Sequence, residues 1–229
     1  HLKRKAEAIH YIDLVDALTQ PGAQISHGTN NLTTPTTWMT TAKAAGFLVI
    51  YNMVESSIKS AFLEAYEAIG SEKLTWDALR DELRELWIES QHARLSRETA
   101  SPSNYLKKAR ELVHRVVARE LIKLTGDDLP ISGNLDARAI RELCATHGIN
   151  HQDPAAAHGG ADLLTVKNKR NNLAHGIESF NEVGRLYTAN DLRRFAEQSA
   201  DYVDAIMVDI DDYLSKRAFL KAAPLKATP

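Results

Sequence analysis

Apolar residues recur at steps of three and four along most of the chain, which is the spacing of helices that bury one face. Convincing alternation of apolar and polar residues, the mark of half-buried strands, is absent. The pattern therefore predicts an all-α fold, a helical bundle of about six to seven helices with a long central core helix. We expect residues 1–229 to form a single helical domain that ends in a flexible tail over residues 222–229.

The expected helices are separated by proline, glycine and runs of small polar residues. They cover about residues 2–18, 37–69, 76–93, 102–124, 135–146, 162–175 and 190–219. Between the first two helices, the polar segment SHGTNNLTTPTT at residues 26–37 is predicted to be a loop. Thr75 and Ser101 are the expected N-caps of the third and fourth helices.

The second helix carries the main apolar stripe of the chain. At ~1.5 Å per residue, it is long enough to cross a small domain. The stripe consists of Phe47, Tyr51, Val54, Ile58, Phe62 and Ala65. We therefore expect this helix to lie at the centre of the core and its aromatic residues to act in packing.

Composition narrows the cellular setting. The 229 residues are 44% hydrophobic, enough for a substantial core, and their formal charge of -2 gives no bulk attraction for nucleic acid. A single cysteine excludes an internal disulfide framework, so we expect a reducing, cytoplasmic setting. The longest apolar run, residues 44–54, is too short and too interrupted to span a membrane, and no signal peptide is apparent.

The most specific chemistry lies in the segment KNKRNNLAHG, residues 167–176, within the predicted helix 162–175. At ~100° per residue, one arc of this helix should face the core, and it holds Leu163, Val166, Leu173 and Ala174. Arg170 falls inside the same arc. The roughly opposite side carries, at four-residue spacing, Lys167, Asn171 and His175. Gly176 should end the helix with a positive φ.

A guanidinium in an apolar arc is costly unless a partner neutralises it. Glu55 is a carboxylate that would also be costly to bury without a partner, because it lies at the edge of the apolar stripe of the long helix. We hypothesise that Glu55 lies close to the motif helix and orients Arg170 or His175.

This set of side chains suits metal-free cleavage of RNA. An imidazole group ordinarily titrates near neutrality, so a histidine such as His175 can take a proton from a ribose 2′-hydroxyl or give one to the leaving 5′-oxygen. Arg170 can hold the phosphate with two parallel hydrogen bonds, and Asn171 can bind a phosphate oxygen or fix the imidazole ring. Lys167 is a supporting cation beside them.

Two further features concern RNA. Arg170 and His175 point ~140° apart on a straight helix, so we expect a homodimer in which two motif helices line one cleft. The helix over residues 102–124 has the most basic face of the chain, and its possible RNA-binding residues are Lys107, Lys108, Arg115 and Arg119. A merely solvated charged face is the alternative for this helix.

Three segments together resemble the HEPN superfamily, in particular a bacterial branch of it. They are YNMVESSIKSAF in the long helix, SGNLDARAIRELCATHGI, and KNKRNNLAHGIESFNEVGR, which contains the R-x4-6-H motif of that family as Arg170-Asn-Asn-Leu-Ala-His175. The resemblance covers roughly residues 42–214.

The resemblance implies an all-α, metal-independent endoribonuclease without a cofactor. Such proteins belong to toxin-antitoxin or antiviral defence systems, act on RNA as dimers and leave 2′,3′-cyclic phosphate ends. It also implies an antitoxin or defence-system partner protein. The catalytic residues it assigns are Arg170 and His175, with Asn171 as the accessory polar residue.

Alternatives remain open at this point. A non-catalytic HEPN module would bind RNA or a partner protein within a defence complex, and a purely structural dimerisation bundle would disperse the polar face of the motif helix. A zinc site is the remaining alternative. Its potential ligands would be Cys144, His147, His151 and His158, but their spacing in the sequence matches no compact zinc site. No carboxylate cluster suited to magnesium is present either.

Overall fold

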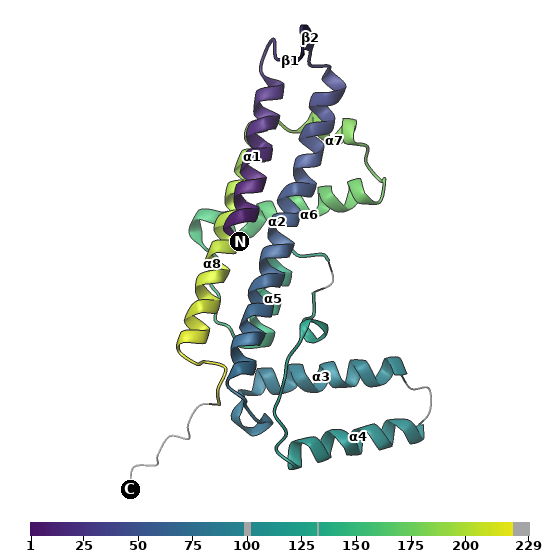
Figure 1. Cartoon of the computed structure of the whole chain (residues 1–229), viewed down its shortest axis with the longest axis vertical. Coiled ribbons are helices and arrows are strands. Elements are labelled where there is room, and N and C mark those ends of the chain that lie inside the picture. The colour runs from purple at the N-terminus through teal and green to yellow at the C-terminus, as the bar shows by residue number, and fades with distance from the viewer. Residues whose placement is uncertain (99–101, 132, 222–229) are drawn as a thin grey trace. The chain divides into compact units, whose positions relative to one another are not determined.

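The computed structural model describes residues 1–98, 102–131 and 133–221 (Figure 1). These residues form eight α-helices and one hairpin: α1 (Leu2–Thr19), β1 (Gln24–His27), β2 (Asn30–Thr33), α2 (Thr36–Ser71), α3 (Asp81–Glu98), α4 (Pro102–Val117), α5 (Ala137–His147), α6 (Ala161–Ala174), α7 (Phe180–Leu186) and α8 (Ala189–Ser215). The all-α fold is therefore confirmed. No helix in these ranges is long and apolar enough to cross a membrane. The expected tail, residues 222–229, and the expected cap Ser101 lie outside the described residues.

The chain packs as two compact units. The first contains residues 1–59, 133–140 and 152–206, and the second contains the described parts of 60–131, 141–151 and 207–221. Three helices, α2, α5 and α8, contribute one part to each unit. The expectation of a single domain stays a prediction.

The first unit is built around the amino-terminal part of α2. Helix α1 lies alongside it (Figure 1), and the Tyr11 hydroxyl donates to the Ala42 carbonyl across 2.9 Å. The part of the predicted stripe that lies in this unit is buried, together with apolar residues from the other helices: Ile12, Phe47, Tyr51, Val54, Ile58, Leu163, Val166, Leu192, Phe195, Tyr202 and Val203. The central position of α2 is thus confirmed for this unit.

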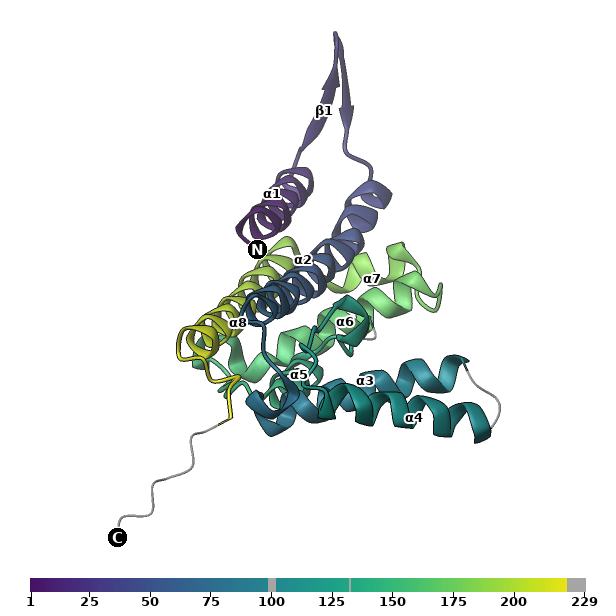
Figure 2. The same ribbon diagram turned by 60° about the horizontal axis from the view of Figure 1, so that its bottom comes forward.

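Part of the predicted loop at residues 26–37 is a β-hairpin that extends beyond the ends of α1 and α2 (Figure 2). Its strands pair Gln24 with Thr33 and Ile25 with Leu32. The loop prediction was wrong because every residue of β2 is exposed, so the hairpin has no buried face to produce apolar alternation. Gly28, at φ +61°, permits the tight turn between the strands.

Helix α7 was not predicted, although its start carries a readable signal. Ser179 and Glu182 form a capping box, in which the Ser179 Oγ accepts from the Glu182 amide and the Glu182 carboxylate accepts from the Ser179 amide. The helix is only seven residues long, too short for apolar periodicity to identify it.

In the second unit, α3 and α4 lie side by side (Figures 1 and 2). This segment buries Leu79, which precedes α3, and three apolar residues within α3: Leu83, Leu86 and Trp87. The predicted start of this helix was wrong, because Trp76–Ala78 form a 3-10 turn and α3 begins at Asp81. Thr75 precedes that turn and makes no side-chain capping bond.

Helix α4 ends at Val117, seven residues earlier than expected. Arg119 takes a positive φ of 55°, and the amides of Arg119 and Glu120 donate back to Val116 and Arg115. This is the hydrogen-bond pattern of a Schellman motif, with arginine in the place that glycine usually takes. The absence of glycine explains why the sequence did not signal this helix end.

The core of the second unit encloses a neutral histidine. His147 is 3% exposed; its Nδ1 lies 2.7 Å from the Leu143 carbonyl and its Nε2 lies 2.7 Å from the Tyr66 hydroxyl. A carbonyl can only accept, so Nδ1 carries the proton and Nε2 accepts from Tyr66. Burial lowers the pKa of His147 to about 4.

We expect this histidine to reduce stability in mild acid. The unfolded chain protonates His147 near pH 6.5 and the folded chain only near pH 4, so between these values the unfolded state binds more protons and the free energy of unfolding falls as pH falls. The full effect is about 3 kcal/mol. Urea unfolding of wild type and His147→Gln between pH 7 and pH 4 should show a shallower decline in the variant, because glutamine cannot take up the proton. Equal slopes would contradict this expectation, as would an NMR titration in which the folded His147 ring protonates near pH 6.5.

Candidate active site

Helix α6 is anchored at its start by a close backbone approach. Gly160 precedes it at φ +73°, and a Cβ at this position would lie 2.4 Å from the Cβ of Ala137. Glycine therefore permits the contact between the start of α6 and the start of α5. The predicted core arc is confirmed for Leu163, Val166 and Leu173, which are buried. It is wrong for Ala174, which is exposed at the last position of the helix.

The carboxyl end of α6 closes in a Schellman motif. The Ile177 amide donates to the Asn172 carbonyl and the Gly176 amide to the Leu173 carbonyl, at 2.8 and 3.3 Å. Gly176 has φ +68°, so the prediction of a positive φ there is confirmed. The C-cap of the helix is His175.

A carboxylate in the following turn fastens this helix end. Glu178 accepts hydrogen bonds from Lys169 Nζ at 2.7 Å and from Asn172 Nδ2 at 2.6 Å. These two bonds hold the pKa of Glu178 below its usual value. The position of the His175 backbone is therefore fixed on both sides, by α6 and by the turn.

Arg170 lies on the inner side of α6 but is not enclosed, because its side chain is 31% exposed. Its guanidinium lies over the ring of Tyr51, 4.5 Å from the centroid, and Nη1 donates to Asn171 Oδ1 across 2.9 Å. Nη2 lies 3.9 Å from Glu55 Oε2. The predicted closeness of Glu55 to the motif helix is confirmed, and its role in orienting catalytic groups stays a prediction.

Tyr51 connects α2 to the loop before α5. Its hydroxyl donates to the Gly133 carbonyl across 2.6 Å and accepts from the Leu135 amide across 3.0 Å. Burial raises the pKa of this hydroxyl, which is thus a neutral donor and acceptor. One side chain therefore holds the loop with its oxygen and the Arg170 guanidinium with its ring.

Asn171 bridges the arginine and this loop. Its Oδ1 accepts from Arg170, and its Nδ2 donates to Asn134 Oδ1 across 2.8 Å. The accessory position of the motif is therefore occupied by a residue that fixes the guanidinium. The expectation that Asn171 holds a phosphate oxygen or the imidazole remains a prediction.

His175 is exposed at the end of α6. Its ring forms no hydrogen bond or ion pair with any residue that the structure describes. Both ring nitrogens are therefore available to exchange protons with a bound molecule.

Lys167 forms an ion pair with Asp136. Its Nζ lies 2.6 Å from Asp136 Oδ2, and the side chains are 19% and 16% exposed. Burial disfavours the Asp136 carboxylate, but hydrogen bonds from Lys167 and from the amide of Ala139 outweigh it and lower the pKa of Asp136. Lys167 therefore joins α6 to the start of α5, and a supporting role toward RNA stays a prediction.

Comparison with known proteins identifies the family of the chain. A family model described as HEPN_MAE_28990-like HEPN matches residues 2–219. The chain belongs to the HEPN superfamily. Neither the curated proteins nor the solved structures contain a match to this HEPN chain.

The possible RNA-binding residues of the HEPN chain lie on or just after α4. Lys107 is exposed and Lys108 is half-buried. Arg115 forms an ion pair with Glu120 at 2.9 Å, and Arg119 forms one with Asp77 at 2.6 Å. Arg115 and Arg119 therefore already have carboxylate partners, and RNA contact by this set remains a prediction.

The zinc alternative has no support among the described residues, where no three His, Cys, Asp or Glu side chains form a group that could hold a metal ion. Cys144 and His147 are core residues, and burial raises the pKa of the Cys144 thiol to about 12. His151 contacts Asp209 at 2.6 Å, and His158 is exposed.

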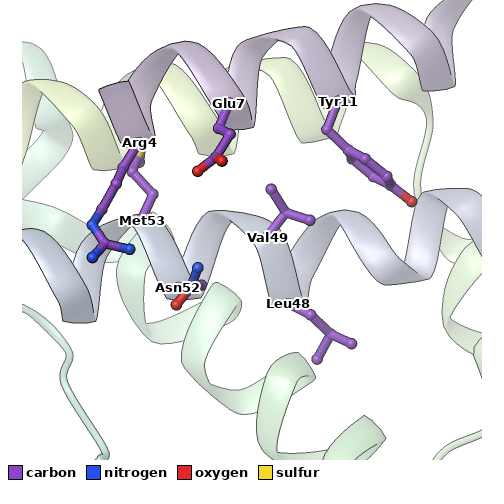
Figure 3. A pocket seen from close by; sticks show the side chains of 7 residues that line it. All are labelled: Arg4, Glu7, Tyr11, Leu48, Val49, Asn52 and Met53. Atoms are coloured by element: carbon purple, nitrogen blue, oxygen red, sulfur yellow. The ribbon is translucent and has the colours of Figure 1, made fainter. Parts of the chain in front are cut away.

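A separate hollow of about 370 Å³ lies between α1 and α2 (Figure 3). Arg4 and Glu7 reach toward α2 from one side, and Asn52 lies on the other. The full lining consists of Arg4, Glu7, Tyr11, Leu48, Val49, Asn52 and Met53. None of these residues belongs to the hydrogen-bond network of Arg170.

Two residues of the Arg170 network were missed by the sequence analysis. Tyr51 was interpreted as a core residue, which it is at 2% exposure, but it also holds Arg170. A signal existed, since Tyr51 lies one helical turn before Glu55 and so shares its face. Asn134 had no such signal, because it lies outside any helix.

We expect Tyr51→Phe to destabilise the protein by about 1–3 kcal/mol. The ring remains under Arg170, but the Gly133 carbonyl and the buried Leu135 amide lose their partner. Urea unfolding measures the change, and the control is Tyr105→Phe at a tyrosine that is 47% exposed. The expectation fails if both variants unfold at the same urea concentration as wild type.

Proposed function

We propose that this HEPN chain is a metal-independent endoribonuclease of a bacterial toxin-antitoxin or antiviral defence system. It acts in the cytoplasm as a homodimer, and an antitoxin or another defence-system protein is its partner. The observation that carries the proposal is that α6 holds both an unengaged, exposed His175 at its carboxyl end and an Arg170 guanidinium that contacts Tyr51, Asn171 and Glu55. A positioned cation and a free imidazole are what cleavage by internal attack requires.

The reaction forms one bond and breaks another at phosphorus. The ribose 2′-oxygen attacks, an imidazole accepts its proton, and the bond to the 5′-oxygen breaks as an imidazolium donates a proton to that oxygen. The products are a 2′,3′-cyclic phosphate and a 5′-hydroxyl. In a dimer, His175 of one protomer acts beside Arg170 of the other, and the same imidazole takes the proton from the 2′-hydroxyl and returns it to the 5′-oxygen. Arg170 binds the phosphate oxygens, where negative charge builds up during the displacement.

Cleavage of total RNA in the presence of chelator tests this function. We expect His175→Ala to lower the rate about 10²- to 10⁴-fold and Arg170→Ala about 10²- to 10³-fold. Matched controls are His158→Ala and Arg185→Ala, at an exposed histidine and an exposed arginine elsewhere in the chain. Wild-type protein that leaves RNA intact, or cleavage that survives both site variants, would refute the proposal.

The shared cleft makes a separate prediction. When Arg170→Ala and His175→Ala chains are co-expressed, mixed dimers regain one site with both residues intact if arginine and histidine come from different protomers. About a quarter of wild-type cleavage should return if each dimer has two composite sites. Light scattering establishes the dimer in the same sample. Dimers without restored cleavage would mean that both residues act from one chain.

The second candidate is a non-catalytic HEPN module that binds RNA or a partner protein in a defence complex. It is favoured by the fact that Arg170 already has three partners within its own chain, which suits a structural arginine. RNA binding that is unaccompanied by cleavage in wild type would select this function.

A further inference from the structure

A chain of donors and acceptors runs outward from Arg170 through two amides. Arg170 Nη1 donates to Asn171 Oδ1, and Asn171 Nδ2 donates to Asn134 Oδ1. A guanidinium can only donate, so Asn171 must turn its oxygen toward Arg170 and its amino group toward Asn134. Asn134 must then present its oxygen to Asn171. The orientation of both amides is therefore set by the fixed charge at the start of the chain.

The amino group of Asn134 is the outer end of this chain. Asn134 is exposed, and its Nδ2 donates to no group among residues 1–98, 102–131 and 133–221. Each amide in the series is polarised in the same sense by the cation, which strengthens the last N–H as a donor. An anionic oxygen is the acceptor that suits such a donor best.

Asn134 is held in place by its two neighbours. The Tyr51 hydroxyl binds the carbonyl of Gly133 and the amide of Leu135, and so grips the backbone on each side of Asn134. The ring of the same tyrosine lies under the Arg170 guanidinium. Tyr51 is buried, so the positions of Asn134 and Arg170 are set by one rigid side chain.

We propose that Asn134 is a further substrate-binding residue, whose amino group donates to an oxygen of the phosphodiester that Arg170 binds. This inference rests on the proposed function, because it takes RNA as the ligand. The arginine supplies the charge, and the asparagine supplies a directed neutral donor beside it. Together they fix the phosphate in two directions before His175 acts.

The competing explanation is that Asn134 merely holds Asn171, and Asn134→Asp separates the two. Aspartate keeps an acceptor oxygen for Asn171 but removes the amino group and adds a negative charge. Asn168→Asp is the matched control, because it makes the same change at an exposed position of α6 outside this network. Asn134→Ala removes the donor without adding charge.

The readouts are affinity for an RNA oligonucleotide with 2′-O-methyl groups, which resists cleavage, and KM and kcat on its unmodified counterpart. We expect Asn134→Asp and Asn134→Ala to weaken affinity and raise KM about ten- to a hundredfold, and Asn168→Asp to change either by less than about threefold. Urea unfolding verifies that each variant is folded, and Asn134→Ser replaces any variant that is not.

Each outcome decides between the proposals. The inference is overturned if Asn134→Asp binds RNA with wild-type affinity. It is also overturned if Asn134→Asp binds weakly while Asn134→Ala binds as tightly as wild type, because the loss in Asn134→Asp would then reflect charge repulsion alone. Wild-type protein that binds RNA without cleaving it, with binding weakened in both Asn134 variants, would overturn the ribonuclease function and support Asn134 as an RNA-binding residue. Absence of RNA binding by wild type overturns both.

Discussion

A permanent positive charge on the inner side of α6 is the constraint on which the candidate site depends. Arginine cannot shed its proton, so Arg170 must be compensated wherever the helix packs. An aromatic face, an amide oxygen and a carboxylate do this, from Tyr51, Asn171 and Glu55. Because two of these residues belong to α2, the charge also determines how α6 lies against the central helix. The apolar contacts of Leu163, Val166 and Leu173 alone would not select one rotation of α6 so narrowly.

Much of this arrangement was predictable from the spacing of apolar residues and from the free-energy cost of burying an unpaired charge. The stripe on α2 follows from residues three and four apart, and the place of Arg170 follows from the wheel of α6. Glu55 was found because a carboxylate at the edge of an apolar stripe needs a cationic partner as much as the arginine needs an anionic one. The positive φ of Gly176 follows from the preference of helix ends for glycine.

The rest depends on contacts that no local pattern records. Periodicity identified Tyr51 as buried, but it contains no information on which loop its hydroxyl reaches, and that loop is more than eighty residues away. Asn134 lies in a short irregular segment whose placement exists only after α2 and α5 have packed. The early end of α4 was hidden for another reason, since Arg119 takes a conformation that arginine rarely adopts. Exposed elements such as the hairpin bury too little side-chain surface to require a regular pattern of apolar residues in the sequence.

The two compact units share three helices, and this makes them hard to separate. The boundaries between residues 59 and 60, 140 and 141, and 206 and 207 all fall inside helices. A protease that requires an extended segment of chain finds no cleavage site at these boundaries. A deletion that removed one unit would interrupt each of the three helices and leave a broken helix end in the other unit. Recombination between genes would face the same obstacle, because neither unit is a contiguous stretch of sequence. The region matched by the family model is therefore expected to be inherited as a whole.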